Sequence, residues 1–379
     1  METMKKIGVY IHIPFCKQKC YYCDFISFAK KEEIQERYIK ALKKEIEDFI
    51  QKNQDIQIST IYIGGGTPSY IDSKYIEKIL SLFNKKNLIE STIEVNPGTV
   101  NKEKLEAYKK AGINRLSIGL QSTSNRLLKQ IGRIHKFEDF LNTYNLAKNI
   151  GFNNINVDLM IGLPNQNIAD IKKSLEEVVK LNPTHISVYS LIIEENTPIA
   201  QMVEKGELNL PDEEEERNMY WYVKNFLELQ GYNHYEISNF SKKGYESKHN
   251  LDCWEQKEYV GFGLAAHSYI NRIRYSNTDN LEKYIKNCEE SRFNENKTIQ
   301  EKQNHFTQEQ EYMLLGLRKI DGVSIQNFKN KFGENPIFVF RNELNKLVEE
   351  KLLKVTEDNI MLTNKGLDLA NLVWEEFVL

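Results

Sequence analysis

The sequence predicts an α/β protein. A partial (β/α)6 barrel of the TIM type comes first, then a small α/β extension, then a winged-helix-like helical domain. Three observations predict this fold. Strand and helix patterns alternate within about the first 190 residues, as in a parallel sheet covered by helices. Glycine and polar residues follow the apolar strands at their carboxyl ends, where such folds form their sites. After Thr307 the alternation gives way to successive helical patterns.

The six predicted strands are short apolar runs rich in β-branched residues. They cover residues 9–13, 60–63, 92–97, 115–121, 154–163 and 185–193. The segments between them carry apolar residues at helical spacing. These predicted helices cover residues 31–50, 73–83, 101–111, 124–131, 137–149 and 168–181. Six units are fewer than the eight of a complete barrel, so we predict an open one.

The second half of the chain has weaker patterns. An acid-rich helix is predicted over residues 208–230, and short strands and loops over 232–275 should extend or close the barrel. Residues 277–300 are polar and predicted to be helical, as a linker or a covering helix.

From Thr307 on, three helical patterns, a hairpin over residues 353–363 and a last helix from Lys365 predict a winged-helix-like module. A bare helical cap is the alternative. We expect three domains, over residues 1–200, 201–300 and 301–379.

The composition excludes several classes of protein. The net charge is −3, and the C-terminal segment carries slightly more acidic than basic residues, so nucleic acid is not an expected partner. No apolar run has the length of a membrane span. Lys5 and Lys6 precede an apolar run and a cysteine, yet this run is too short for an export signal and contains His12 and Pro14. Five cysteines, three of them clustered, favour a reducing cytoplasm over a disulfide framework.

The clustered cysteines, Cys16, Cys20 and Cys23, directly follow the first predicted strand. Thiolates suit iron–sulfur clusters. Three ligands would leave one iron of a four-iron cluster open to a substrate. A structural zinc site is the alternative, with His12 as its fourth ligand, although His12 would have to turn back from its strand. Three unrelated buried thiols are a further alternative.

Other polar groups lie at the strand ends. Residues 64–68 form a Gly-Gly-Gly-Thr-Pro turn, which either admits a ligand close to the backbone or simply makes a tight turn. Glu94 and Asp158 lie on otherwise apolar strands, where an unpaired carboxylate is costly. Either could bind a ribose or an ammonium group, and the alternative is a salt bridge to Arg115 or Arg133.

His249, Cys253 and Trp254 form a second group. Histidine and cysteine are haem-iron ligands, and tryptophan can pack on a porphyrin. The alternative is a packed loop without a ligand.

Together these segments resemble the HemW-type haem chaperones, radical SAM (S-adenosylmethionine) proteins related to oxygen-independent coproporphyrinogen III oxidase. The resemblance is carried by residues 10–16, 22–25, 64–68, 94–97, 132–135, 158 with 162–164, 235–240, and 249–250 with 254.

The resemblance implies a [4Fe–4S] cluster on Cys16, Cys20 and Cys23. It implies one SAM site with Tyr10, Gly65, Glu94 and Ile192. Positions that contact a second SAM in the oxidase are matched by Tyr22, Gly66, Thr67, Gln121, Arg133 and Asp158. Haem is expected at His249 or Cys253, where Cys253 replaces the tyrosine of the family's His-Asn-x-x-Tyr-Trp motif.

Two departures from the oxidase favour the chaperone branch: Phe25 stands where the oxidase has a further cysteine, and the chain starts almost at its first strand. The resemblance then implies a cytoplasmic chaperone that delivers haem to respiratory or other haem proteins. Membrane contact would occur at most through these recipients, and we expect a homodimer as one assembly. No catalytic residue is assigned. The oxidase activity itself is a second hypothesis, and a winged-helix regulator with a redox-sensing cluster is a third.

Overall fold

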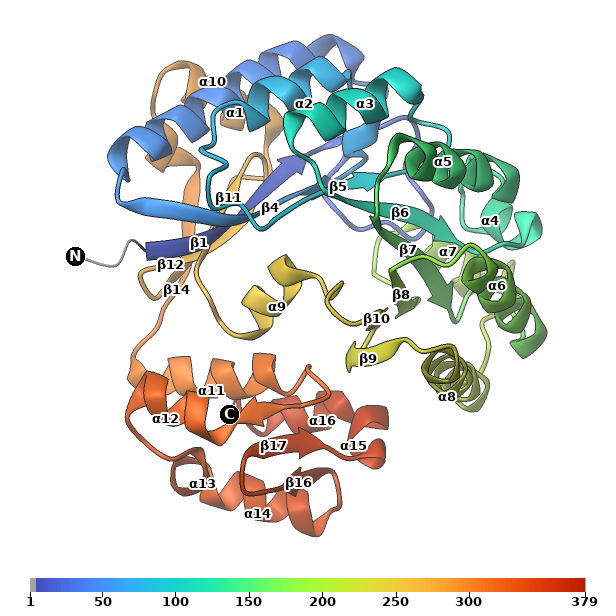
Figure 1. Cartoon of the computed structure of the whole chain (residues 1–379), viewed down its shortest axis with the longest axis vertical. Helices are drawn as coiled ribbons and strands as arrows, with labels where there is room; N and C mark the ends of the chain where they lie inside the picture. Colours follow the sequence, from blue (N-terminus) through green and yellow to red (C-terminus); the bar gives the residue numbers. More distant parts are fainter. Residues whose placement is uncertain (1–4, 379) are drawn as a thin grey trace.

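Twelve strands of the computed structural model, which describes residues 5–378, form one sheet. Their order is β14-β13-β12-β11-β1-β4-β5-β6-β7-β8-β10-β9. The six predicted strands lie side by side and in parallel. They are β1 (Lys5–Ile13), β4 (Ile56–Gly65), β5 (Glu90–Val95), β6 (Arg115–Gln121), β7 (Asn154–Ile161) and β8 (His185–Ser190). The sheet is curved, with helices on its convex side (Figure 1), and the six parallel strands do not close into a ring, so the predicted partial barrel is confirmed.

Helices cover the convex face of this sheet. They are α1 (Glu32–Lys52), α2 (Ser73–Leu80), α3 (Lys102–Ala111), α4 (Asn125–Gln130), α5 (Phe137–Ile150) and α6 (Ile168–Lys180). Each presents an apolar stripe to the sheet, such as Tyr38, Leu42 and Ile46 of α1, which are completely buried. Gly112 ends α3 with a φ of 99°, a conformation that glycine adopts without strain.

Both edges of the sheet come from the weakly patterned second half of the chain. On one edge, β11 (Tyr259–Phe262) pairs in parallel with β1, and β12 (His267–Ile270), β13 (Ile273–Asn277) and β14 (Lys297–Lys302) continue antiparallel. On the other edge lie β10 (Asn239–Ser241) and β9 (Asn233–Glu236), both antiparallel to their neighbours. The smaller elements of this part and of the loops are β2 (Phe15–Cys16), β3 (Phe28–Ala29), η1 (Pro68–Tyr70), α7 (Pro198–Glu204), α8 (Glu213–Leu229) and α9 (Lys248–Trp254).

The prediction of a helix throughout residues 277–300 is wrong. Only α10 (Leu281–Glu289) and the short η2 (Phe293–Asn296) are helical, and the chain then enters β14. Because β14 is an edge strand with mostly exposed polar side chains, it has no hydrophobic alternation from which it could have been recognised.

The C-terminal domain has its own core, which includes Met313, Leu317, Phe328, Phe340 and Val373. Its helices are α11 (His305–Gly316), α12 (Ile325–Phe332), α13 (Pro336–Val339), α14 (Arg341–Glu349), α15 (Asn364–Asp368) and α16 (Ala370–Glu375). Its strands are β15 (Val323–Ser324), β16 (Leu353–Val355) and β17 (Asn359–Leu362), which form one small sheet. The β16–β17 hairpin confirms the winged-helix-like prediction and excludes the bare helical cap.

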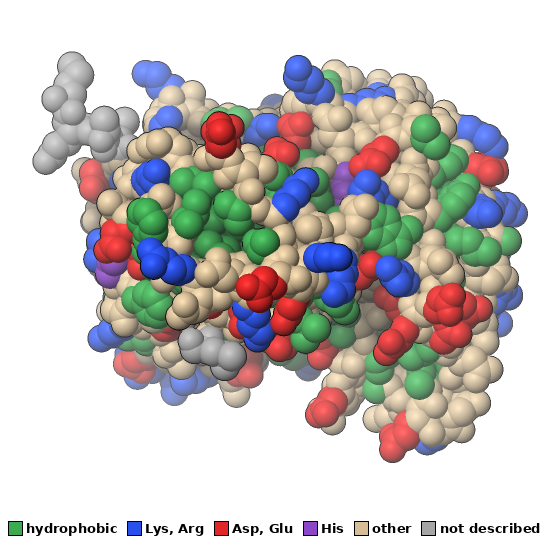
Figure 2. All heavy atoms as spheres, turned by 90° about the horizontal axis from the view of Figure 1, so that it is seen from below, with side chains coloured by type: hydrophobic (Ala, Val, Ile, Leu, Met, Phe, Trp, Pro, Cys, Tyr) green, Lys and Arg blue, Asp and Glu red, His purple; other side chains and the backbone are tan. Residues whose placement is uncertain are grey.

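The surface of this domain mixes charged and apolar groups. Phe306, Phe338 and Leu372 are among its exposed apolar side chains. In the view from below, hydrophobic side chains are interspersed with charged groups of both signs (Figure 2). Among residues 5–378, no helix combines the length and the apolar character that crossing a membrane requires.

The C-terminal domain contacts the barrel through α9 and the segments beside it. The Arg318 guanidinium lies between two indole rings, 4.5 Å from the Trp254 centroid and 4.8 Å from the Trp374 centroid. Next to it, the Gln256 side chain donates to the Gln308 carbonyl at 3.1 Å and to Glu311 at 2.8 Å. These contacts hold the end of α9 against the C-terminal domain.

Candidate functional site

A cavity of about 540 Å³ opens at the carboxyl ends of the parallel strands. This is the edge where the polar strand-end residues were expected to meet. Twelve of the fifteen predicted site residues line it: Cys16, Cys20, Tyr22, Cys23, Gly65, Gly66, Thr67, Glu94, Gln121, Arg133, Asp158 and Ile192. Tyr10, His249 and Cys253 are not among its lining residues.

The three cysteines are all free thiols on the wall of this cavity. The Thr67 hydroxyl donates to Cys16 Sγ at 3.5 Å. A Cβ on Gly66 would lie 2.9 Å from the same sulfur, so only glycine lets the turn approach the cysteine loop this closely. Burial raises the pKa of the Cys16 and Cys23 thiols, and binding of a metal cluster would displace their protons.

His12 does not face the thiols. Its Nε2 donates to the Ile26 carbonyl at 2.9 Å, and its Nδ1 pairs with the Tyr10 hydroxyl at 3.0 Å. Both ring nitrogens are therefore engaged, and the alternative of a zinc site with His12 as fourth ligand is wrong. Instead, His12 anchors the end of the cysteine loop to β1. Gly65, with a φ of +116°, packs against this imidazole, where a Cβ would lie 2.8 Å from the ring.

Glu94 lies on the cavity wall and accepts a hydrogen bond from the Tyr62 hydroxyl at 3.0 Å. Burial, reinforced by the negative charge of Asp158, raises the pKa of Glu94 to about 7. A ligand that offers an ammonium group or hydroxyl donors would stabilise the ionised form of this buried carboxylate.

Asp158 accepts hydrogen bonds from Asn156 Nδ2 at 2.7 Å and from the Ser117 hydroxyl at 3.4 Å. Burial raises its pKa, too. The charge of Arg133 acts on both carboxylates, and that of Arg115 on Asp158, but within residues 5–378 neither arginine lies within salt-bridge distance of Asp158 or Glu94, so the salt-bridge alternative is wrong for both carboxylates.

Arg133 connects the cysteine loop to the end of β5. Its Nη1 donates to Asn96 Oδ1 at 2.9 Å, and its Nη2 donates to the Tyr22 hydroxyl at 2.8 Å. Its Nε is buried and has no hydrogen-bond partner within the described range, residues 5–378. Asn96 also donates to the Thr67 hydroxyl at 2.9 Å. This network fixes the Arg133 guanidinium on the same cavity wall as the carboxylates of Glu94 and Asp158.

The remaining lining residues differ in character. Gln121 is the last residue of β6 and lines the cavity. Its φ is 71°, and the pairing of β6 with β7 shifts register at a bulge at this position. Ile192 and Phe25 are 68% and 63% exposed. The cavity therefore has a polar interior and apolar groups open to solvent.

The segment with His249 and Cys253 is helix α9, so the packed-loop alternative is wrong about its conformation. The Glu90 carboxylate accepts hydrogen bonds from the backbone amides of Lys248 and His249, at 3.0 and 3.1 Å, and so caps the start of this helix. His249 is buried, and its Nδ1 pairs with the Thr60 hydroxyl at 2.9 Å.

Burial lowers the pKa of His249 to about 4, so its imidazole is neutral at physiological pH. Within residues 5–378, its Nε2 has no hydrogen-bond partner. Burial raises the pKa of Cys253 to about 12, which keeps this thiol protonated.

Sequence reasoning missed Tyr62, which links the two groups. Its hydroxyl donates a hydrogen bond to Glu94 on the cavity wall, and its ring centroid lies 5.4 Å from the centroid of the His249 ring. His249 is thus separated from the cavity by one side chain. Tyr62 precedes Gly64 by two positions on β4, and strand alternation could have placed both on the same face. Asn96 was missed as well, although it follows Glu94 at the same spacing.

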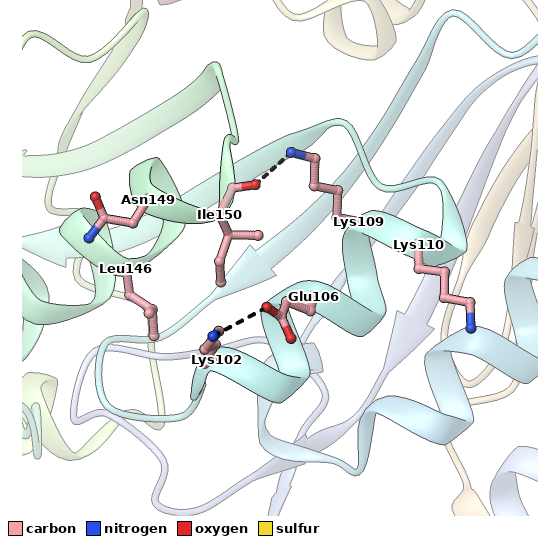
Figure 3. Close-up of a pocket in the computed structure, with 7 residues that line it drawn as sticks. All are labelled: Lys102, Glu106, Lys109, Lys110, Leu146, Asn149 and Ile150. Carbon is pink, nitrogen blue, oxygen red and sulfur yellow. Dashed lines mark hydrogen bonds and ion pairs between the residues drawn. The ribbon is translucent and has the colours of Figure 1, made fainter.

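A second hollow, of about 740 Å³, lies among the outer helices α3 and α5 (Figure 3). Its charged groups are engaged locally: Lys109 donates to the Ile150 carbonyl at 2.6 Å, and Lys102 lies 3.8 Å from Glu106. Lys110 points away from the other residues. None of the predicted site residues lines this hollow, and it is not the candidate site.

Comparisons with known proteins agree with this geometry. Residues 10–178 match the model of the radical SAM superfamily, and residues 308–369 match that of the HemN C-terminal domain. The chain is 39% identical to the heme chaperone HemW of Bacillus subtilis, over 98% of this chain and 99% of that protein. It is 38% identical to the heme chaperone HemW of Lactococcus lactis, over 99% and 98%. The solved coproporphyrinogen III oxidase HemN of Escherichia coli has the same fold, with a TM-score of 0.85 and 23% identity over 99% of this chain and 90% of that one.

Proposed function

The chain belongs to the HemW family of haem chaperones, and on that premise we propose that it binds a [4Fe–4S] cluster, SAM and haem and delivers the haem to haem-dependent proteins. The observation that carries the proposal is one cavity whose wall includes three free thiols, the carboxylates of Glu94 and Asp158, and the guanidinium of Arg133.

The donor set on this wall suits the cluster and SAM. Cys16, Cys20 and Cys23 would hold three irons, and the fourth iron would be available to SAM. When bound, the cluster supplies one-electron chemistry to the sulfonium ligand. Glu94 would accept hydrogen bonds from the ammonium group or ribose of SAM, while Arg133 keeps Tyr22 and the cysteine loop against β5. Gln121 and Asp158 would contact a second polar ligand group.

Two features support haem handling instead of oxidase turnover. Phe25 and Ile192 line the cavity as exposed apolar groups, and a planar apolar macrocycle would pack against groups of this kind. In addition, His249 offers a neutral imidazole with a free Nε2, the form that haem iron binds. Because His249 is buried, haem would reach it only if α9 or Tyr62 moves.

We place this function in the cytoplasm, where a reducing environment keeps the five thiols free. The recipients would be haem-dependent enzymes, including respiratory ones, and any membrane contact would come through them. A homodimer is our proposed assembly state.

The test is a haem titration followed by Soret absorbance. His249→Ala should weaken haem binding about tenfold or more, since an iron ligand is lost. Cys253→Ala tests the second ligand. His267→Ala is the matched control, since His267 is an exposed histidine outside the cavity. Equal haem binding in all four proteins would overturn the haem assignment.

The oxidase remains the second function to test, because the cavity wall retains every predicted SAM position except Tyr10. Cluster-loaded protein should leave coproporphyrinogen III unchanged under reducing conditions with SAM. Decarboxylation of this substrate to vinyl groups would favour the oxidase over the chaperone.

A further inference from the structure

A histidine and two glutamates meet in the C-terminal domain, away from the cavity. His305 and Glu309 lie one turn apart on α11, and Glu334 comes from the loop between α12 and α13. One potential ligand atom from each residue lies within 4.8 Å of the other two. Positions i and i+4 share one face of a helix, which explains why the first two meet. The fold brings Glu334 to them.

Glu309 is the unusual member of this group. It is 3% exposed, and its buried Oε1 receives no hydrogen bond from any residue that the structure describes. The His305 Nε2 lies 3.5 Å from this oxygen. Neither Glu309 nor Glu334 forms an ion pair with a lysine or arginine among the described residues. A buried carboxylate oxygen without a partner is costly, and a cation between these three side chains would remove the cost.

The distances suit direct coordination. Ligand atoms about 2.0–2.2 Å from a tetrahedral zinc ion lie roughly 3–4 Å from one another. The His305–Glu309 pair already has this spacing. Glu334 is exposed and can adjust, whereas the Phe332 ring lies edge-on to the His305 ring with 5.8 Å between centroids. This contact limits the orientation of the imidazole.

We propose that His305, Glu309 and Glu334 form a divalent-metal site of the zinc class, which clips α11 to the α12–α13 loop. The imidazole ligand selects zinc and related transition metals over magnesium and calcium, which prefer sites made of oxygen alone. Three protein ligands leave a position for water, so the ion would be exchangeable. The charge of the bound ion would offset the cost of burying the Glu309 carboxylate. This site is independent of the cluster and of haem.

Zinc titration of the full-length chain by calorimetry tests the site. Cys16, Cys20 and Cys23 are replaced by alanine in every protein, because their thiolates would otherwise compete for zinc. We expect about one zinc ion per chain and a rise in Tm when zinc is added, since the ion binds the folded state. His305→Ala and Glu334→Gln should each weaken zinc binding about tenfold or more. Both residues are exposed, so these variants should fold even if Glu309→Gln does not.

Glu357→Gln is the matched control: it removes an exposed carboxylate of the same domain, in the β16–β17 turn, and should leave zinc binding unchanged. Absence of zinc binding in the parent protein would overturn the proposal, as would equal affinity in the parent, His305→Ala and Glu334→Gln. Displacement of zinc by an equal concentration of magnesium would show that the imidazole is not a ligand and would also overturn it.

Discussion

Glu94 offers a direct test of the cavity, because its burial should make the ligand-free fold less stable. We predict that Glu94→Gln stabilises the chain without cluster or SAM at pH 8 and has little effect at pH 4.5. Glu94 has a pKa of about 7 in the folded chain, against an ordinary value of 4.5. At about 1.4 kcal/mol per pKa unit, this difference corresponds to about 3 kcal/mol of unfolding free energy. Because Glu94 faces an open cavity, solvent should reduce the measured gain to about 1–3 kcal/mol.

The sign of the effect follows from proton binding. Between pH 4.5 and 7 the folded chain holds a proton on Glu94 that the unfolded chain has released, so stability from this group is lost as the pH rises. Glutamine does not titrate, and its amide oxygen can still accept the hydrogen bond from the Tyr62 hydroxyl. The variant should therefore not lose stability at this position as the pH rises.

Urea denaturation of both proteins at several pH values measures the difference, with Glu357→Gln as the surface control. A gain that does not grow between pH 4.5 and 7, or a variant that is less stable at pH 8, would refute the reasoning. Titration with SAM should show the opposite effect of Glu94→Gln, because the ligand would lose its carboxylate partner.

Two further predictions concern the cysteine loop and the C-terminal domain. Alanine at Cys16, Cys20 or Cys23 should reduce the iron content of anaerobically purified protein to background, whereas Cys288→Ala should retain it; equal losses in all four would disprove the cluster assignment. Gly322→Ala should destabilise the C-terminal domain by about 3 kcal/mol, because its φ is +69° and the new Cβ would lie 2.0 Å from the Ile360 carbonyl oxygen. Gly333→Ala, at a φ of +84° with open space around it, should cost only about 1 kcal/mol, and similar losses of urea stability in both variants would contradict this account.

The partners of the charged cavity residues could not be predicted from the sequence. A salt bridge from Asp158 to Arg115 or Arg133 was a reasonable alternative, yet Asp158 bonds to Asn156 and Arg133 bonds to Asn96 and Tyr22. Hydrogen-bond partners depend on distances of a few tenths of an ångström between residues far apart in the chain. Residue type and spacing do not encode such distances.

The partial barrel, the winged-helix-like domain and the edge of the sheet where the polar residues gather could be predicted from the residues alone. Apolar strands and amphipathic helices have fixed periods, and parallel strands bring their carboxyl ends to one edge, so order along the chain is enough for these features. Three features depend on how the whole chain packs: β14 is a strand, Tyr62 lies between Glu94 and His249, and Glu334 reaches His305 and Glu309. An edge strand of polar residues lacks the alternation of apolar and polar side chains from which a strand is predicted. Contacts between separate segments arise only when the whole chain packs.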